Sequence, residues 1–173
     1  MPSPFDQWRD ALDLWRIPEH ILAAAPESPW IHPVELFDIS ALDVIPDSPS
    51  HAAARAGLGS SLLDVGCGGG RHHVFYNVAD LKPFVEALSA HARNRVVVEL
   101  PMNHPLSDLS PWWQHFWGLE RPTTPTALDA AECVRSLGYD VHVEIAEATA
   151  TPSVDEDALV RFMRIRRCLT PDR

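Results

Sequence analysis

The sequence predicts an α/β fold, in which strands alternate with helices within a single domain. One observation is an apolar run that leads through an acid into a glycine-rich turn, Leu62–Gly70, as expected of a buried strand that delivers its backbone to a ligand. A second is the β-branched run Val96–Val98, which lacks polar alternation and is typical of a strand covered on both faces. A third is helical periodicity in several segments around these two. The length of 173 residues fits one domain.

Residues 1–47 are predicted to form an N-terminal helical cover. Apolar side chains recur every three or four residues along one face of a helix that stops at Pro18, namely Phe5, Trp8, Leu12 and Trp15. A second short helix opens at Pro18 and continues to Pro26, because proline is tolerated in the first turn of a helix. The stretch 26–46 mixes prolines with apolar residues, which indicates an extended covering segment.

Residues 48–173 are predicted to form the α/β core. Strands are expected at 61–65, 95–100 and 141–145, the last half-exposed because apolar and polar residues alternate in it. Helices are expected at 49–56, 81–92 and 127–137, with Ser48, Asp80 and Thr126 as their caps and with Gly138 ending the third.

A capping box, Ser153-x-x-Glu156, predicts one more helix. Its apolar residues are expected to point inward, namely Leu159, Phe162, Met163 and Leu169. Its basic residues are expected to form a solvated face, namely Arg161, Arg164, Arg166 and Arg167.

Composition excludes several classes of function. The net charge of −10 argues against nucleic acid as the main partner, because that binding rests on a positive surface, and it favours a small-molecule substrate. The longest apolar run, Ile21–Ala25, is far too short to span a membrane, and no signal segment opens the chain. Three cysteines without metal-type spacing, Cys67, Cys133 and Cys168, predict reduced thiols and a cytoplasmic location.

The glycine-rich run has the chemistry of a nucleotide-type binding turn. Glycines lack a Cβ atom, so the backbone N–H groups of the turn can approach a ligand closely. The Asp64 carboxylate can accept hydrogen bonds from polar groups of that ligand. A ligand-free turn after a strand is the alternative interpretation of the glycines alone.

The run Leu62-Leu63-Asp64-Val65-Gly66-Cys67-Gly68-Gly69-Gly70 resembles the first motif of class I S-adenosylmethionine-dependent methyltransferases. The dinucleotide fingerprint of dehydrogenases fits less well, because its third glycine would fall on Arg71. The resemblance implies a Rossmann-like sheet and S-adenosylmethionine as the cofactor. The residues that it implies in cofactor binding are Asp64, Gly66, Cys67, Gly68, Gly69, Gly70 and His73.

The resemblance breaks after the motif. A segment starting at His72-His73-Val74-Phe75-Tyr76 looks like the one that follows the fourth strand of the family, and it is joined to the motif at Arg71. A parallel crossover needs a dozen residues or more, and only residues 71–79 precede the next helix. We therefore expect a sheet that lacks strands two to four and the terminal hairpin of the family, with an internal gap near 70–72. Two explanations stay open: a lost segment, or a genuinely shortened protein.

Methyl transfer from a sulfonium is an in-line displacement that depends mainly on positioning, so a dedicated base is optional. Candidate polar residues are His73, Tyr76, Asn77, Glu99 and His104, each of which has a purely structural alternative, and no catalytic residue is assigned. The pair His72-His73 lacks further ligands at metal-type spacing, so no metal is expected.

The most aromatic segment of the chain contains Trp112, Trp113, Phe116 and Trp117. It is either a turn that packs in the core or a lid over an apolar or aromatic methyl acceptor, since the family commonly builds acceptor specificity after its fifth strand. The function predicted from these features is S-adenosylmethionine-dependent methyl transfer to a small molecule. The alternative is a shortened, non-catalytic protein that binds a ligand or serves as a scaffold.

Overall fold

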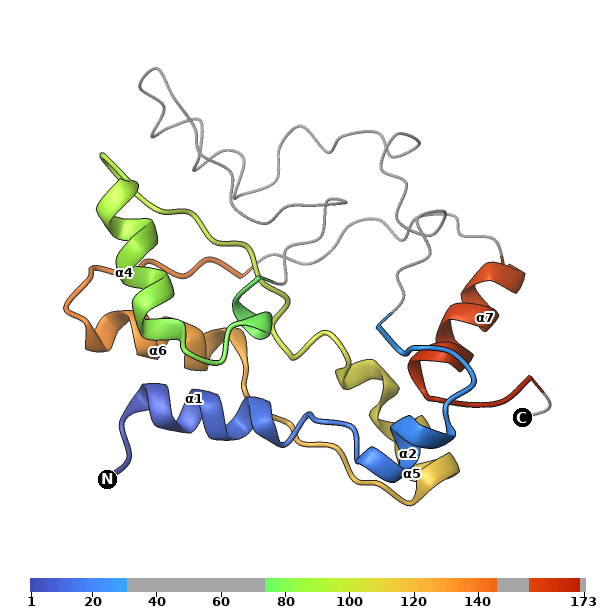
Figure 1. Cartoon of the computed structure of the whole chain (residues 1–173). Coiled ribbons are helices and arrows are strands. Elements are labelled where there is room, and N and C mark those ends of the chain that lie inside the picture. Colours follow the sequence, from blue (N-terminus) through green and yellow to red (C-terminus); the bar gives the residue numbers. More distant parts are fainter. Residues whose placement is uncertain (31–73, 146–155, 172–173) are drawn as a thin grey trace.

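The computed structural model describes residues 1–30, 74–145 and 156–171, and every regular element within these ranges is helical (Figure 1). In chain order these are α1 (Pro4–Asp13), α2 (Glu19–Ala24), the 3-10 turn η4 (Phe75–Asn77), α4 (Leu81–His91), the 3-10 turn η5 (Ser107–Leu109), α5 (Ser110–Trp117), α6 (Ala127–Ser136) and α7 (Glu156–Arg166). None of these helices combines the length and hydrophobicity that a membrane crossing requires.

The first helix begins at a capping box that the periodicity of its apolar face does not reveal. The hydroxyl of Ser3 accepts a hydrogen bond from the backbone N–H of Asp6 (3.2 Å), and the Asp6 carboxylate accepts one from the backbone N–H of Ser3 (3.3 Å). The helix ends at Asp13, earlier than the predicted stop at Pro18, since the chain continues with tighter turns. Trp15 therefore lies beyond the helix rather than on its face.

The boundaries of α4 and α6 follow the predicted signals. Asp80 occupies the N-cap position of α4, but its side chain makes no capping hydrogen bond. Thr126 caps α6 through a capping box in which its hydroxyl accepts from the backbone N–H of Asp129 (3.3 Å). The chain leaves α6 through Gly138 at a φ of +85°, a conformation that glycine adopts without steric cost. These two predicted helices are confirmed, as is the short helix after Pro18, which is α2.

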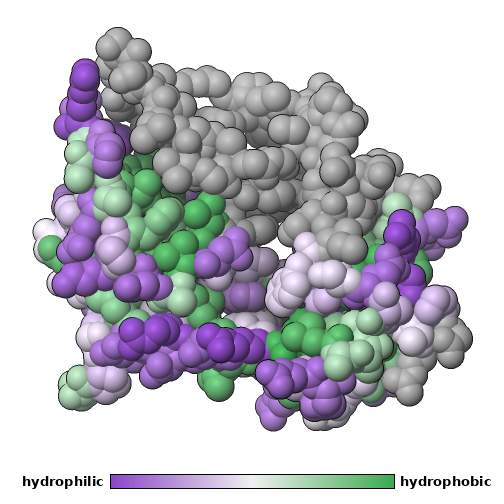
Figure 2. All heavy atoms as spheres, viewed as in Figure 1, coloured by the Kyte–Doolittle hydropathy of each residue, from purple (hydrophilic) through white to green (hydrophobic). Residues whose placement is uncertain are grey.

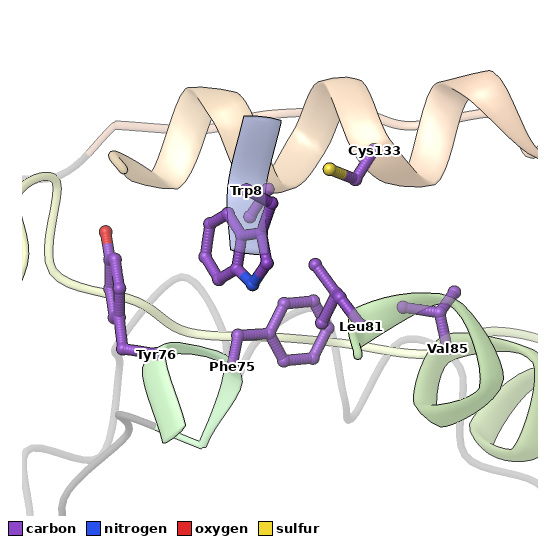
Figure 3. Packing of buried hydrophobic residues seen from close by; sticks show 7 residues of the cluster. Trp8, Phe75, Tyr76, Leu81, Val85 and Cys133 are labelled. Carbon is purple, nitrogen blue, oxygen red and sulfur yellow. The ribbon is translucent and has the colours of Figure 1, made fainter. Parts of the chain in front are cut away.

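Helices α1, α4 and α6 pack against one another around a first hydrophobic cluster. Its buried residues are Trp8, Phe75, Tyr76, Leu81, Val85, Ala130 and Cys133. Figure 3 shows the Trp8 indole between α6 and the segment that carries Phe75 and Tyr76. The indole Nε1–H of Trp8 donates to the carbonyl oxygen of Val78 (3.0 Å), so burial of this large side chain leaves no polar group unsatisfied.

A second hydrophobic cluster joins the N-terminal part of the chain to α5 and to the residues after α7. Its buried residues are Ile17, Ile21, Leu109, Trp113 and Cys168. The aromatic segment forms helix α5, with Pro111 in its first turn and with Gly118 ending it at a φ of +62°. The described residues thus have two separate hydrophobic cores.

The predicted Rossmann-like sheet is wrong for the part of the chain that the structure describes. Residues 95–100 and 141–145, both expected as strands, form neither strands nor a ladder there. Val96, Val97 and Val98 are 40%, 38% and 42% exposed, whereas a strand covered on both faces would bury them. A β-branched run has the propensity for a strand, but a strand exists only where a neighbour accepts its hydrogen bonds. The predicted helix 49–56 and strand 61–65 lie outside the described residues.

The arginines near the C-terminal end of α7 also depart from the prediction. Arg161 is exposed as expected, but Arg166 and Arg167 are buried. The helix ends at Arg166, and the chain then turns at Cys168, which has a φ of +58°, so residues 165–169 are all buried. Leu169 is buried as predicted, although it lies beyond the helix. Ser153 of the predicted capping box lies outside the described residues.

Candidate functional site

Three aromatic side chains from distant parts of the sequence meet at the first hydrophobic cluster, of which Tyr76 is a member. The imidazole of His104 stacks on the indole of Trp15, with ring centroids 3.9 Å apart and planes inclined by 11°. The ring of Tyr76 meets the same imidazole edge-on, at 5.4 Å and 75°. We call these three residues the aromatic cluster. It brings together two residues singled out in the sequence, Tyr76 and His104, and adds Trp15.

Main-chain carbonyl groups hold two members of the aromatic cluster in place. The indole Nε1–H of Trp15 donates to the carbonyl oxygen of Thr124 (2.7 Å), in the connection between α5 and α6. The hydroxyl of Tyr76 donates to the carbonyl oxygen of Pro101 (3.0 Å), with that of Met102 close by at 3.3 Å. The first contact joins the N-terminal part of the chain to the loop between α5 and α6. The second joins η4 to the loop before η5, and neither loop forms a helix or a strand at these residues.

A hydrogen bond to the imidazole of His104 defines which ring nitrogen carries the proton in the neutral form. Its Nδ1 accepts a hydrogen bond from the backbone N–H of Leu106 (3.2 Å), which requires a lone pair on Nδ1. The proton of the neutral ring is therefore on Nε2. The carbonyl oxygen of His104 also accepts from the backbone N–H of Ser107 (2.8 Å), so the loop before η5 has a defined conformation around this residue.

Tyr76 is unsuited to proton transfer at neutral pH. Burial raises the pKa of its hydroxyl far above the ordinary value, and the nearby charge of Asp129 raises it further. The hydroxyl proton is engaged with a carbonyl oxygen, as described above. Of the two candidate polar residues in the aromatic cluster, Tyr76 therefore has a structural role in the described chain.

Arg121 is buried beside Trp15 and forms no ion pair with a carboxylate among the described residues. Its guanidinium donates hydrogen bonds to the carbonyl oxygens of Trp15 and of Arg16, the latter at 3.3 Å. The same group lies 5.1 Å from the ring centroid of Trp15 and 5.2 Å from that of Trp113. Burial lowers the pKa of Arg121, and arginine remains charged even so.

The four lid candidates divide into two faces of α5. Trp113 is only 1% exposed and belongs to the second hydrophobic cluster, while Trp117 packs against that cluster and donates from Nε1 to the carbonyl oxygen of Arg167 (2.7 Å). Trp112 is 47% exposed and stacks on the partly exposed Phe116, with centroids 6.3 Å apart. The core interpretation thus applies fully to Trp113, whereas Phe116 and Trp117 are partly buried and Trp112 is the most exposed of the four.

The remaining candidates are not gathered into one place by the described structure. Asn77 and Glu99 are exposed, away from the buried part of the aromatic cluster. The residues predicted to bind the cofactor, Asp64, Gly66, Cys67, Gly68, Gly69, Gly70 and His73, lie outside the described residues. Within the described ranges, no group of three or more histidine, cysteine or acidic residues has the geometry to hold a metal ion.

The described cysteines are buried thiols. Burial raises the pKa of Cys133 to about 11, with the charges of Asp129 and Glu132 adding to the effect, and burial also raises the pKa of Cys168. A thiol that stays protonated is a poor nucleophile, so neither group is a candidate for chemistry.

The sequence did not single out Arg121, and it predicted only that Trp15 lies on the apolar face of the first helix. Arg121 sits in a proline-rich connection, where nothing in its immediate neighbours distinguishes it from a solvated arginine.

Comparison of the chain with known protein families, with curated proteins and with solved structures finds no match.

Proposed function

We propose that this protein binds S-adenosylmethionine and transfers its methyl group to a small apolar or aromatic acceptor. The observation that carries the proposal is the run Leu62–Gly70, whose acid and glycines fit the first motif of class I methyltransferases at all nine positions. The cofactor supplies a methyl group on a sulfonium, which an acceptor displaces in line. The protein has to orient the two reactants and exclude water.

The described residues support the acceptor part of this proposal through α5. Trp113 and Trp117 fix the helix in the second hydrophobic cluster, so the stacked pair Trp112 and Phe116 is presented on a rigid element. Two flat apolar rings, one of them half-exposed, suit an aromatic ligand. No base is needed where the acceptor is already nucleophilic, which agrees with the structural role of Tyr76.

The proposal is tested first by calorimetry of the 173-residue chain with S-adenosylmethionine and S-adenosylhomocysteine. We expect stoichiometric binding of both, weakened about tenfold or more in Asp64→Ala because a charge-assisted hydrogen bond is lost. The matched control is Asp140→Ala, which removes an exposed acid far along the chain. Absence of binding to the wild-type chain contradicts the proposal.

Methyl transfer itself is measured with a methyl-labelled cofactor and a panel of small phenols, indoles and aliphatic amines. We expect label in one of the aromatic classes. A second candidate function, a non-catalytic ligand-binding or scaffold protein, is favoured by one observation: residues 95–100 and 141–145 form no sheet in the described ranges. Tight cofactor binding without transfer to any acceptor would support that second function.

A further inference from the structure

Arg167 is a buried cation whose hydrogen-bonding groups are not used by the described residues. The residue is only 9% exposed, and its Nε is fully buried without a hydrogen-bond acceptor in the described part of the chain. Neither of its terminal nitrogens donates to a described residue, and no described carboxylate forms an ion pair with the guanidinium. The guanidinium of Arg121, which is also buried, donates instead to two main-chain carbonyl oxygens.

A guanidinium in this state favours the binding of an anion. Burial removes water from the charge and lowers the pKa of Arg167, although arginine stays charged at neutral pH. The ring of Trp112, whose centroid is 4.9 Å away, offsets only part of the lost hydration. The two terminal nitrogens are not among the fully buried atoms, so a ligand can reach them. A carboxylate can accept two parallel hydrogen bonds from a guanidinium, which is the pairing that Arg167 lacks.

The backbone around Arg167 fixes the residue between α5 and the end of α7. The indole Nε1–H of Trp117 donates to the carbonyl oxygen of Arg167 (2.7 Å), and the backbone N–H of Arg167 donates to the carbonyl oxygen of Arg164 (3.1 Å). Figure 1 shows α2, α5 and α7 at one end of the molecule, and Figure 2 shows hydrophobic and hydrophilic surface side by side at that end. A ligand there meets a charged residue whose main chain is already held in place.

Aromatic surface adjoins the guanidinium. Trp112 is 47% exposed and stacks on Phe116, with ring centroids 6.3 Å apart. The imidazole of the exposed His115 meets Phe116 edge-on at 4.7 Å. A half-exposed aromatic ring next to a cation matches a ligand that has an aromatic ring and an anionic group close to it. A small anion without a ring would leave Trp112 unused.

We propose that Arg167 and Trp112 form a binding site for a small aromatic carboxylic acid. The carboxylate of the ligand accepts hydrogen bonds from the Arg167 guanidinium, and its ring lies against the exposed part of Trp112. That this ligand is the methyl acceptor rests on the proposed function, and it narrows the acceptor class to aromatic acids. Binding of the acid itself needs no cofactor.

The test is calorimetry of the 173-residue chain without cofactor, using 3-(4-hydroxyphenyl)propionate, its neutral amide and propionate as probes. We expect the aromatic acid to bind stoichiometrically with a dissociation constant below about 1 mM. The amide and propionate should each bind at least about tenfold more weakly, because the amide lacks the charge and propionate lacks the ring. A wild-type chain that binds the acid no more tightly than either control, or not at all, overturns the proposal.

Substitutions locate the site. Arg167→Gln should abolish the preference for the acid over the amide while the amide still binds, a result that unfolding would not give. Arg167→Lys keeps the charge but loses the fork, so it should weaken binding of the acid several-fold. Trp112→Ala should weaken binding of both aromatic probes alike. The matched control is Arg93→Gln, at an exposed arginine just after α4, which should leave all affinities unchanged.

Either folded Arg167 variant can contradict the site. Circular dichroism shows whether each variant is folded. A folded Arg167→Gln that keeps the preference for the acid overturns the proposal, and so does a folded Arg167→Lys with unchanged affinity for it. An equal loss of preference in Arg93→Gln would also contradict a site at Arg167.

Cofactor binding is measured separately, so failure of this site and failure of the proposed function can be told apart. A chain that binds S-adenosylmethionine but not the aromatic acid contradicts the site at Arg167 alone. A chain that binds the aromatic acid but not S-adenosylmethionine contradicts the proposed methyl transfer and retains the site.

Discussion

The guanidinium of Arg121 donates a hydrogen bond to the carbonyl oxygen of Trp15 while lying against the indole ring of the same residue. The chain leaves α1 here, and α1 has no basic residue in its last turn. Arg121, which lies 106 positions further along the chain than Trp15, thus donates to carbonyl groups just beyond the end of α1. Trp113 of the second hydrophobic cluster has its ring centroid 5.2 Å from the same guanidinium, so Arg121 connects Trp15 to that cluster.

Replacing Arg121 should therefore destabilise the described fold as a whole. Arg121→Met keeps much of the apolar volume but leaves the carbonyl groups of Trp15 and Arg16 without their donor. We expect a loss of about 1–3 kcal/mol in the free energy of unfolding, measured by urea denaturation. Arg121→Lys should also be destabilising, because an ammonium group cannot reproduce the planar fork and the ring contacts. Unchanged stability in both variants would mean that the guanidinium makes no net contribution to the free energy of unfolding.

The division of α5 into two faces predicts different outcomes for adjacent tryptophans. Trp113→Ala removes a fully buried indole and should cost about 3–5 kcal/mol of stability. Trp112→Ala removes a half-exposed ring that lies 4.9 Å from the buried Arg167 guanidinium, so it should cost about 1 kcal/mol, less than Trp113→Ala, while it raises the KM for an aromatic acceptor if the proposed function is correct. Cofactor affinity measured by calorimetry should not change in Trp112→Ala. An equal loss of cofactor and acceptor binding would contradict the lid.

Cys133 predicts a fall in stability at alkaline pH. Its pKa in the folded chain, about 11, is above the ordinary thiol value of 9.0, so folding favours the protonated form. The stabilisation is complete below about pH 9 and is lost as pH rises through 11, on the order of 2 kcal/mol in all. Denaturation of wild type and Cys133→Ala at several pH values measures this, and the variant should show a shallower decline. Parallel declines would assign the loss to other groups.

Glu27 predicts a salt-sensitive contact between the N-terminal part of the chain and α7. Its carboxylate accepts from Arg161 (3.0 Å) and Arg164 (3.4 Å), and the Arg164 side chain is mostly buried. Glu27→Gln should lower the free energy of unfolding by about 0.5–1 kcal/mol at low ionic strength, and by less at about 1 M salt. Glu120→Gln, at an exposed acid outside the helices of the described residues, is the matched control. A loss independent of salt would argue against an electrostatic contribution.

Local signals in the sequence predicted most helix boundaries correctly, because a capping residue forms hydrogen bonds with backbone groups no more than about four residues away. Thr126 and Gly138 bracket α6 as expected, and proline at position 18 precedes α2. The helix at 110–117 was not predicted, because its aromatic residues suggested only a core turn or a lid. Pro111 in its first turn and Gly118 at its end are nevertheless ordinary signals of helix boundaries.

The errors concern interactions between distant residues. Val96–Val98 has the composition of a strand, but pairing depends on a neighbour that local sequence cannot supply. Arg166 and Arg167 fall on a basic stretch that suggests solvent exposure, and the turn at Cys168 buries them instead. The rings of Phe162 and Trp112 lie about 5 Å from their guanidinium groups, a compensation visible only in three dimensions.

The second hydrophobic cluster has a consequence for synthesis of the chain. Ile17 and Ile21 share their cluster with Cys168, which the ribosome adds about 150 residues later. At about 5–20 residues per second, the cluster around α2 stays incomplete for about 8–30 seconds. During that interval the nascent N-terminal segment is a substrate for chaperones, and slowing translation before position 168 should lengthen its dependence on them.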